Sequence, residues 1–338
     1  MIVRPLIISF VLSLVLFTFV FYKQSYEVIP PEIVCKDCNV ILITMTNLRY
    51  DHMSSNGYFR PTTPNLDSFA KEGIVFDNAF SHASLTGANR ISLYTGLYPF
   101  QHGFWGGSAS SGRRLPKEIP TILEILKKNG YTTAAFTGSD TGLSNRFDEH
   151  QKCNIGAPYK LPPQKRYYGS VIFSEFSCSI PKALDWLKKN SSKKFFMHVQ
   201  GFDTHCPFSQ RGGYTFDKDY KGNIDYSVCF WTFEKSEPIL KDGRKYYLVY
   251  SEKQGVQQKF LLGEEDISHL IALYDESIKF ADEKTGLLLN GIEDMGLNKK
   301  TIIVFTSEHG EIFGKHGLFM RGGGTFYDDV LHVPLIIG

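Results

Sequence analysis

Thr86 and Arg90 lie one helical turn apart in the segment "SLTGANRISLYTG", residues 84–96, which opens with small residues. If the segment is a short helix, the Thr86 hydroxyl lies at its N-terminus, where backbone N–H groups and the positive end of the helix dipole favour phosphate or sulfate. The Arg90 guanidinium could then bind two anionic oxygens at once. Two interpretations of Thr86 stay open: a nucleophile, or a helix cap whose hydroxyl satisfies a backbone N–H.

Three other segments place polar residues directly after apolar, strand-like stretches. Thr46 and Asn47 follow "VILITM", His205 comes shortly after "FFMHVQGF", and Glu308 and His309 follow "TIIVFTS". In an open α/β sheet, ligands bind beyond the carboxyl ends of the strands, so these residues are expected to meet the helix start described above. Each pair taken alone is equally typical of a solvated turn, and only the joint pattern favours a functional site.

Such a set of side chains suits attack on a tetrahedral anionic ester. Glu308 and His309 are suitable ligands for a divalent cation, which would hold an ester oxygen and lower the pKa of a coordinated hydroxyl. His205 could hydrogen-bond the substrate or protonate the leaving oxygen. Arg90 could hold the anion, although pairing with a surface carboxylate is the simpler alternative for any single arginine.

The apolar pattern predicts the elements that must position these residues. The run "NVILITM" is apolar almost throughout, as expected of a strand buried on both faces of a sheet. Alternating strands and helices favour a mostly parallel sheet covered on both faces. Strands are expected at 39–45, 74–80 and 132–136, within 193–203 and 299–310, and from 333 onward; helices are expected at 64–72 with Thr63 as cap, and at 87–96, 120–130, 180–190 and about 265–289. The region 151–259 has weak periodicity and is expected to form insertions and loops around the site.

The bulk composition argues against a nucleic-acid-binding protein. Among 338 residues, 37 are Lys or Arg and 35 are Asp or Glu, so no excess of positive charge marks a surface for a phosphate backbone. The length allows one large core or two domains of about 100 to 200 residues each. Function must therefore be argued from local sites.

Residues 6–22 form an uninterrupted apolar run between Arg4 and Lys23. The run is near the lower limit of about 17 residues for a membrane-spanning helix and exceeds the roughly 7 to 15 of a signal-peptide core. No small-x-small cleavage motif follows in the linker-like "KQSYEVIPPE". We expect 1–23 to be a single-pass anchor, 24–38 a linker, and 39–338 the main domain outside the cytoplasm; a cleaved signal peptide and a secreted protein are the alternative.

Six cysteines are compatible with an oxidising compartment. Cys35 and Cys38 form a single Cys-x-x-Cys, for which a local disulfide or two free thiols are expected rather than zinc, because no second such pair follows. The remaining four, at 153, 178, 206 and 229, could pair, but their spacing does not decide the connectivity.

Several blocks of the sequence agree in order and spacing with one known family. The blocks "NVILITMTNLRYDHMSSNGYFRPTTPNLDSFAKEGIVFDNAF", "TGANRISLYTGLYP", "FDTHCPF", "TIIVFTSEHGEIFGKHG" and "VLHVPLIIG" resemble the sulfatase family of the alkaline phosphatase superfamily, from about Asn39 to the last residue. The resemblance implies an α/β sandwich around a mixed, mainly parallel sheet with helices on both faces. The smaller C-terminal antiparallel domain that such enzymes usually carry is expected to be absent or truncated.

The resemblance also implies roles for individual residues and for a cofactor. Calcium is the cation that the family implies first, with magnesium, manganese or zinc as alternatives. The implied roles are nucleophile for Thr86, anion binding for Arg90 and a substrate contact for His205. Metal ligation is implied for Glu308, His309 and Thr46, and Asn47 or Asp51 could compensate for the missing charge at Thr46. Further substrate contacts are implied for His316 and Arg321.

The chain departs from the family pattern at some of these positions. Sulfatases proper oxidise a cysteine or serine to formylglycine within Cys/Ser-x-Pro-x-Arg, whereas this chain reads Thr86-Gly-Ala-Asn-Arg90, and oxidation of threonine would give a ketone. Thr46 stands where the family has an aspartate, which removes a negative charge, and Glu308 moves the remaining carboxylate by one methylene. Threonine is the nucleophile in related phosphodiesterases and in phosphoethanolamine or phosphoglycerol transferases, so attack by its alkoxide stays open.

We therefore expect a metal-dependent hydrolase of sulfate or phosphate esters, carried on a glycan or a lipid, in which Thr86 attacks instead of formylglycine. Two alternatives stay open. One is a catalytically degenerate relative, in which the cation site is impaired and the surface binds anions or glycans. The other is a transferase of the phosphoethanolamine or phosphoglycerol type.

Overall fold

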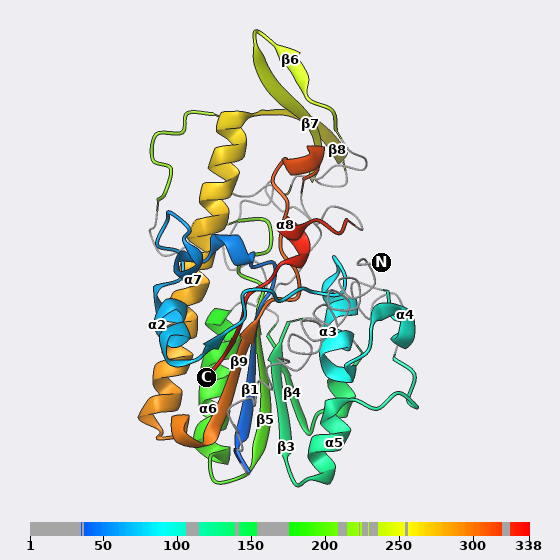
Figure 1. The fold of residues 1–338 in the computed structure, drawn as a ribbon, viewed down its shortest axis with the longest axis vertical. Helices are drawn as coiled ribbons and strands as arrows, with labels where there is room; N and C mark the ends of the chain where they lie inside the picture. The colour runs from blue at the N-terminus through cyan, green and yellow to red at the C-terminus, as the bar shows by residue number, and fades with distance from the viewer. Residues whose placement is uncertain are drawn as a thin grey trace, which may run out of the picture. The chain divides into compact units, whose positions relative to one another are not determined.

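A computed structural model describes the fold (Figure 1). The described residues are 35, 37–105, 115–138, 142–153, 176–208, 215–222, 224, 229, 236–253, 256–319 and 325–338. The predicted anchor at 1–23 and most of the linker at 24–38 lie outside them. Across the described part of the chain, no helix combines the length and the apolar character needed to cross a bilayer.

Among the described residues, seven strands form the central sheet: β1 (Asn39–Met45), β2 (Ile74–Val75), β3 (Thr132–Thr137), β4 (Glu149–Lys152), β5 (Phe195–Gly201), β9 (Thr301–Thr306) and β10 (Leu335–Ile337). Their order is β2-β10-β9-β1-β5-β3-β4. The pairs β1–β5, β1–β9, β3–β5 and β3–β4 are parallel, whereas β10 runs antiparallel to β9 and β2. The predicted mostly parallel sheet is thereby confirmed, and β1, β5 and β9 end side by side at one edge.

Helices cover both faces of this sheet, as predicted. Figure 1 shows α2 (Pro64–Glu72), α6 (Phe176–Asn190) and α7 (Glu264–Asp294) on one face, and α3 (Thr86–Thr95), α4 (Pro99–His102) and α5 (Ile122–Lys128) on the other. Shorter turns are η1 (Tyr50–His52), η2 (Ser54–Asn56), η4 (Ser144–Arg146), η6 (Asn298–Lys300), η7 (Lys315–Gly317) and α8 (Asp328–Leu331).

The apolar character of β1 follows from its position between the two helical layers. Successive side chains of a strand point to opposite faces. Ile41 and Ile43 join the apolar cluster of α6 and α7, whereas Val40 and Leu42 pack against the smaller cluster around Ile91 of α3. A strand that is covered on both sides has no solvent-facing positions, which explains its continuous apolar run.

The start of α2 is capped from another helix. Thr63 is the N-cap residue, as predicted, but its side chain makes no capping hydrogen bond. Its hydroxyl donates to Asp67 Oδ1 (2.7 Å), and Asp282 of α7 accepts instead from the backbone N–H groups of Asn65 (3.0 Å) and Leu66 (2.9 Å). Burial of Asp282 raises the pKa of its carboxyl group. These contacts attach α2 firmly to α7.

The middle of the chain contains structure that the sequence pattern does not predict. Instead of loops alone, it holds an antiparallel sheet of β6 (Ile239–Lys241), β7 (Arg244–Lys253) and β8 (Val256–Gly263). Asp242 and Gly243 form the two-residue turn between β6 and β7, with φ of 51° and 74°. Asp-Gly between two strands is a strong signal for a β-hairpin. The hairpin was not predicted because the flanking residues show little strand periodicity. Conversely, the expected strand at 74–80 shrinks to Ile74–Val75 at the sheet edge.

Disulfide bonds join segments that are distant in sequence. Cys153 pairs with Cys178, and Cys206 pairs with Cys229. Neither Cys35 nor Cys38 is a free thiol. The second of the described bridges fixes the segment directly after His205.

Candidate active site

Thr86 is the first residue of α3, and its hydroxyl is directed away from the capping position. The N-cap residue is Leu85, and no side chain caps this helix. Thr86 Oγ1 instead lies 3.1 Å from Nε2 of His309, and Thr86 is half-buried while His309 is fully buried. The hydroxyl therefore faces an imidazole, which a simple helix cap would not require.

The hydrogen bond at the other ring nitrogen assigns the tautomer of His309. Its Nδ1 lies 2.8 Å from the carbonyl oxygen of Gly310, which can only accept, so Nδ1 carries the proton. In the neutral ring Nε2 is then an acceptor, and the Thr86 hydroxyl donates to it. This is the orientation that a general base needs in order to activate a hydroxyl nucleophile.

Close packing of the segment after β9 explains the "EHG" sequence there. Gly310 donates its backbone N–H to the carbonyl of Val330 (2.6 Å). A Cβ at position 310 would collide with the carbonyl oxygen of Asp329. Glycine is thus required for the segment that carries Glu308 and His309 to lie against α8.

Arg90 and Glu308 face each other inside the protein. Arg90 lies one turn beyond Thr86 on α3, is 2% exposed, and places Nη2 at 3.6 Å from Oε1 of Glu308. The N–H groups of the first turn of α3 have no acceptors within the helix. Together with the guanidinium, they make this end of α3 electropositive next to the Thr86 hydroxyl.

Gln200 is a site residue that sequence reasoning missed. Its amide Nε2 donates both to Glu308 Oε1 and to Thr46 Oγ1, the latter at 3.2 Å. Gln200 lies near the end of β5, where the register places it opposite Thr44 of β1. The available signal was a large polar residue near the end of a buried, mostly apolar strand.

Asn47 holds an unusual backbone conformation at the same edge. Its φ is 66°, in the left-handed region that Asn tolerates better than most residues. Its side-chain Nδ2 donates to Glu311 Oε2 (2.7 Å), and both residues are fully buried. The Tyr274 hydroxyl of α7 donates to the Asn47 carbonyl (2.7 Å) and accepts from the N–H of Arg49 (3.0 Å), which secures the turn.

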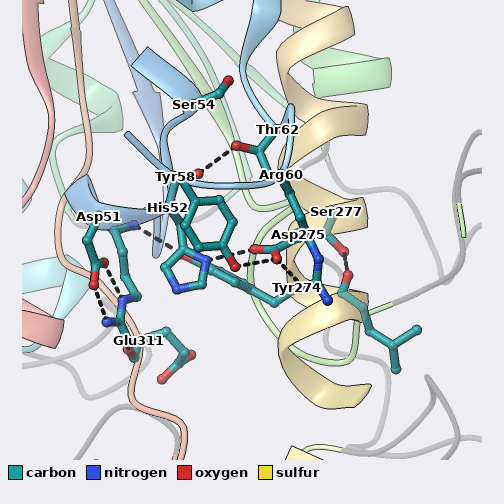
Figure 2. A network of polar contacts seen from close by, with 12 residues as sticks. Asp51, His52, Ser54, Tyr58, Arg60, Thr62, Tyr274, Asp275, Ser277 and Glu311 are labelled. Atoms are coloured by element: carbon teal, nitrogen blue, oxygen red, sulfur yellow. Dashed lines mark hydrogen bonds and ion pairs between the residues drawn. The ribbon is translucent and has the colours of Figure 1, made fainter. Parts of the chain in front are cut away.

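A polar network around Asp275 of α7 holds the loop that follows this turn (Figure 2). His52 Nδ1 lies 2.7 Å from Asp275 Oδ1, and Tyr58 and Arg60 each donate to Oδ2 at 2.6 Å. Burial and the neighbouring carboxylate raise the pKa of Tyr58, so its hydroxyl stays protonated and donates. The network fixes residues 52–60 on α7 and, through Tyr274, the position of Asn47.

The other predicted residues make contacts of their own. His205 is buried after β5, and its Nδ1 donates to the carbonyl oxygen of Cys206 (2.6 Å), so Nε2 is left to accept in the neutral ring and to donate in the protonated ring. His316 stacks on Tyr327 with ring centroids 3.6 Å apart, and its Nε2 lies 3.9 Å from Asp329. Arg321 lies outside the described residues.

The predicted ligands of a divalent cation converge, but they do not form a suitable set. In the described ranges, no group of three or more His, Cys, Asp or Glu could hold a metal ion. Thr46 and Asn47 are uncharged, and the amide of Gln200 donates into the space between Thr46 and Glu308. In the described part of the site, the buried oxygens that remain as potential ligands are Asn47 Oδ1, Gln200 Oε1 and Glu308 Oε2.

Comparisons with known proteins agree with this architecture. The sulfatase family model matches residues 38–338. The chain is 25% identical to an ulvan-active sulfatase of Formosa agariphila, covering 99% of this chain and 61% of that protein, and 25% identical to the iduronate 2-sulfatase of Homo sapiens, covering 88% and 59%. The phosphonate monoester hydrolase of Agrobacterium radiobacter has the same fold, with a TM-score of 0.64 and 20% identity over 89% of this chain and 68% of that one.

The chain spans a little over half the length of the curated relatives it matches, 53% of the first of them. The family match nevertheless includes every residue of the site described above. It begins at the residue before β1 and continues to the last residue of the chain. The chain belongs to the sulfatase family.

Proposed function

We propose that this protein hydrolyses anionic esters of sulfur or phosphorus through a covalent intermediate on Thr86. The observation that carries the proposal is the hydrogen bond from the Thr86 hydroxyl to Nε2 of His309, at 3.1 Å, beside the buried Arg90. Nucleophile and base are within hydrogen-bond reach, and a third group, the Gly310 carbonyl, orients the base.

In the first step, His309 Nε2 takes the proton of the Thr86 hydroxyl while Oγ1 attacks the sulfur or phosphorus atom. The bond from that atom to the ester oxygen breaks, and the leaving oxygen takes a proton. Protonated His205 supplies it from Nε2, because its Nδ1–H is engaged with the Cys206 carbonyl. Proton transfer of this kind contributes about 10²- to 10⁴-fold to a rate.

In the second step, water must cleave the ester on Thr86. A threonine ester has no second hydroxyl that could expel the anion, so water attacks the sulfur or phosphorus atom directly. His205, left neutral by the first step, takes the proton of the water at Nε2, and His309 returns its proton to Thr86 Oγ1 as the bond from Oγ1 to sulfur or phosphorus breaks and the inorganic anion leaves. His309 is then neutral and His205 protonated again, as they were before the first step.

Charge on the transferred group is met by the start of α3. The N–H groups of the first turn lie at the end of α3 that begins with Thr86, and Arg90 lies one turn along the same helix, so both would donate to the non-bridging oxygens of the transferred group. Donors of this kind are worth about 10²- to 10³-fold each when they are preorganised in a buried site.

The relatives support a carbohydrate ester as the first substrate class to test. The two relatives are named for ulvan and for iduronate 2-sulfate. A sulfated glycan is accordingly the substrate proposed here, and a phosphate ester of a lipid or glycan is the second class.

A non-catalytic, anion-binding protein is the second candidate function. The observation that favours it is the loss of charge at Thr46, together with the Gln200 amide bound to Glu308. In that case Arg90 and the α3 N-terminus would bind a sulfated or phosphorylated ligand without turning it over.

Turnover of chromogenic sulfate, phosphomonoester and phosphodiester substrates separates these functions. The proposal predicts turnover by the unmodified protein, loss with Thr86→Ala, and partial retention with Thr86→Ser, which keeps a hydroxyl. Thr95→Ala, at the opposite end of α3, is the matched control and should remain active. Equal turnover by Thr86→Ala would remove Thr86 from the mechanism, and binding without turnover by any protein would leave the second function.

We also propose that the site works outside the cytoplasm, on a single-pass anchor at residues 1–23. The two described disulfides support an oxidising compartment. Protease treatment of intact cells tests the location, since an extracytoplasmic domain would be degraded and a cytoplasmic one would be protected.

A further inference from the structure

Both buried glutamates after β9 are bound by side-chain amides. The Gln200 amide donates to Glu308, and the Asn47 amide donates to Glu311 at 2.7 Å. All four side chains are 1% exposed or less. In a cation site, carboxylate oxygens turn toward the ion; here N–H groups are turned toward the carboxylates instead.

A full positive charge reaches the same oxygen that the amide binds. Arg90 Nη2 lies 3.6 Å from Glu308 Oε1, the atom that also accepts from Gln200. A buried carboxylate needs both a counter-charge and hydrogen bonds. Arg90 supplies the first and Gln200 the second.

The remaining oxygens are too few and too weakly charged for a divalent ion. Asn47 Oδ1 and Gln200 Oε1 are neutral, and Glu308 Oε2 belongs to a carboxylate whose charge Arg90 already shares. Thr46 Oγ1 accepts from Gln200, and His309 Nε2 accepts from Thr86. Calcium takes six to eight oxygen ligands, and magnesium requires a nearly ideal octahedron.

We propose that Gln200 and Arg90 take the place of a divalent cation at Glu308, so that this site keeps its geometry and binds its anion without a metal ion. The amide nitrogen of Gln200 donates to both Thr46 and Glu308, two of the predicted metal ligands. This inference concerns the site of the proposed function, but it does not depend on Thr86 being a nucleophile.

Metal content of the full chain tests the inference directly. The purified protein is dialysed against calcium, magnesium, manganese or zinc, then against metal-free buffer, and analysed by mass spectrometry. We expect substoichiometric amounts of every ion and the same melting temperature with chelator and with millimolar calcium. A stoichiometric ion that disappears in Glu308→Gln would overturn the inference.

A single isosteric change should restore a cation site. Gln200→Glu replaces the donating amide by a second carboxylate against Glu308, so the melting temperature should fall in chelator and rise when calcium is added, with a stoichiometric ion bound. Gln101→Glu, on the exposed end of α4, is the matched control and should respond to neither. A folded Gln200→Glu protein that binds no cation would show that Gln200 does not occupy a cation position.

Failure of this inference and failure of the proposed function give different results. An inactive protein that binds no metal would refute the proposed function and leave the inference intact. An active protein with a stoichiometric, Glu308-dependent ion would refute the inference and leave the proposed function intact. If Gln200→Glu does not fold, the measurements on the unmodified protein still decide the outcome.

Discussion

The two sides of the site differ in the side chains that they contribute. On the α3 side, a hydroxyl, an imidazole and a guanidinium stand in an arrangement suited to attack: Thr86, His309 and Arg90. On the side of β1 and β5, hydroxyl and amide groups stand where a cation site would need acids: Thr46, Asn47 and Gln200. The hydroxyl and the guanidinium come from α3, whereas the uncharged groups of the other side come from β1, β5 and the turn after β1, so substitutions can change one side without displacing the other.

The two sides also differ in the contacts that hold them in place. The start of α3 is held locally, since Asn89 Oδ1 accepts from the N–H groups of His82 and Ala83, both at 2.9 Å. The turn after β1 is held from far along the chain, by Tyr274 and Asp275 of α7. Damage to the turn should therefore reduce stability more than it alters the nucleophile.

His309→Gln should give the largest effect on the α3 side. Glutamine keeps a hydrogen-bonding group but cannot take the Thr86 proton, so kcat should fall by roughly 10²- to 10⁴-fold. The change is measured with the best substrate of the chromogenic panel. His269→Gln on α7, which removes a contact to Asp217, is the control and should leave kcat unchanged. Unchanged turnover in His309→Gln would exclude this base.

Arg90→Met should affect both sides, because Glu308 would keep its buried charge and lose its counter-charge. Removing one partner of a buried ion pair costs about 3 kcal/mol or more in the free energy of unfolding. Urea unfolding measures the loss, and Arg90→Lys, which restores the charge, should recover part of it. Equal stability of Arg90→Met and the unmodified protein would show that Arg90 does not neutralise Glu308.

Asp275→Asn should weaken the long-range support of the turn. The amide cannot accept from His52, Tyr58 and Arg60 as the carboxylate does, so we expect a loss of about 2 kcal/mol in the free energy of unfolding. Asp294→Asn, at the exposed end of α7, is the matched control. A loss no larger than that of the control would mean that the network of Figure 2 contributes little to stability.

His198 should give the smallest effect, as a pH dependence of stability. Burial, with the positive charges of Arg90 and His150, holds the pKa of His198 well below its usual range. Below about pH 6.5 the unfolded chain binds a proton that the folded chain does not, so stability falls as pH is lowered, by at most about 1.4 kcal/mol per pH unit. His198→Gln should remove this part of the slope in urea unfolding at pH 7 and pH 5. An unchanged slope would contradict the buried neutral imidazole.

The sequence predicts the α3 side well for physical reasons. Thr86 and Arg90 are neighbours on one helix, and their spacing alone places them together. Glu308, His309, Thr46 and Asn47 follow parallel strands, whose carboxyl ends share one edge whatever the detailed strand order. The prediction of a mostly parallel sheet was therefore enough to gather them.

What the sequence does not predict depends on contacts between distant segments. Gln200 looks like one more residue of a buried strand until β5 is known to lie beside β1, and Asp275 is separated from His52 by more than 200 residues. Whether the Gln200 amide donates to Glu308 depends on how the strands lie in space. The sequence alone therefore does not tell a site that binds a cation from one in which Gln200 binds Glu308 instead. The hairpin between β6 and β7, by contrast, could have been predicted from its turn residues Asp242 and Gly243 alone.

The most direct test of the account is to trap the covalent intermediate. The protein is mixed with its best substrate, quenched in acid within the burst phase, and the peptide that contains Thr86 is analysed by mass spectrometry. The account predicts a sulfuryl or phosphoryl group on Thr86 in the unmodified protein and none in Thr86→Ala. Product formation with an unmodified Thr86 peptide throughout the burst would contradict it.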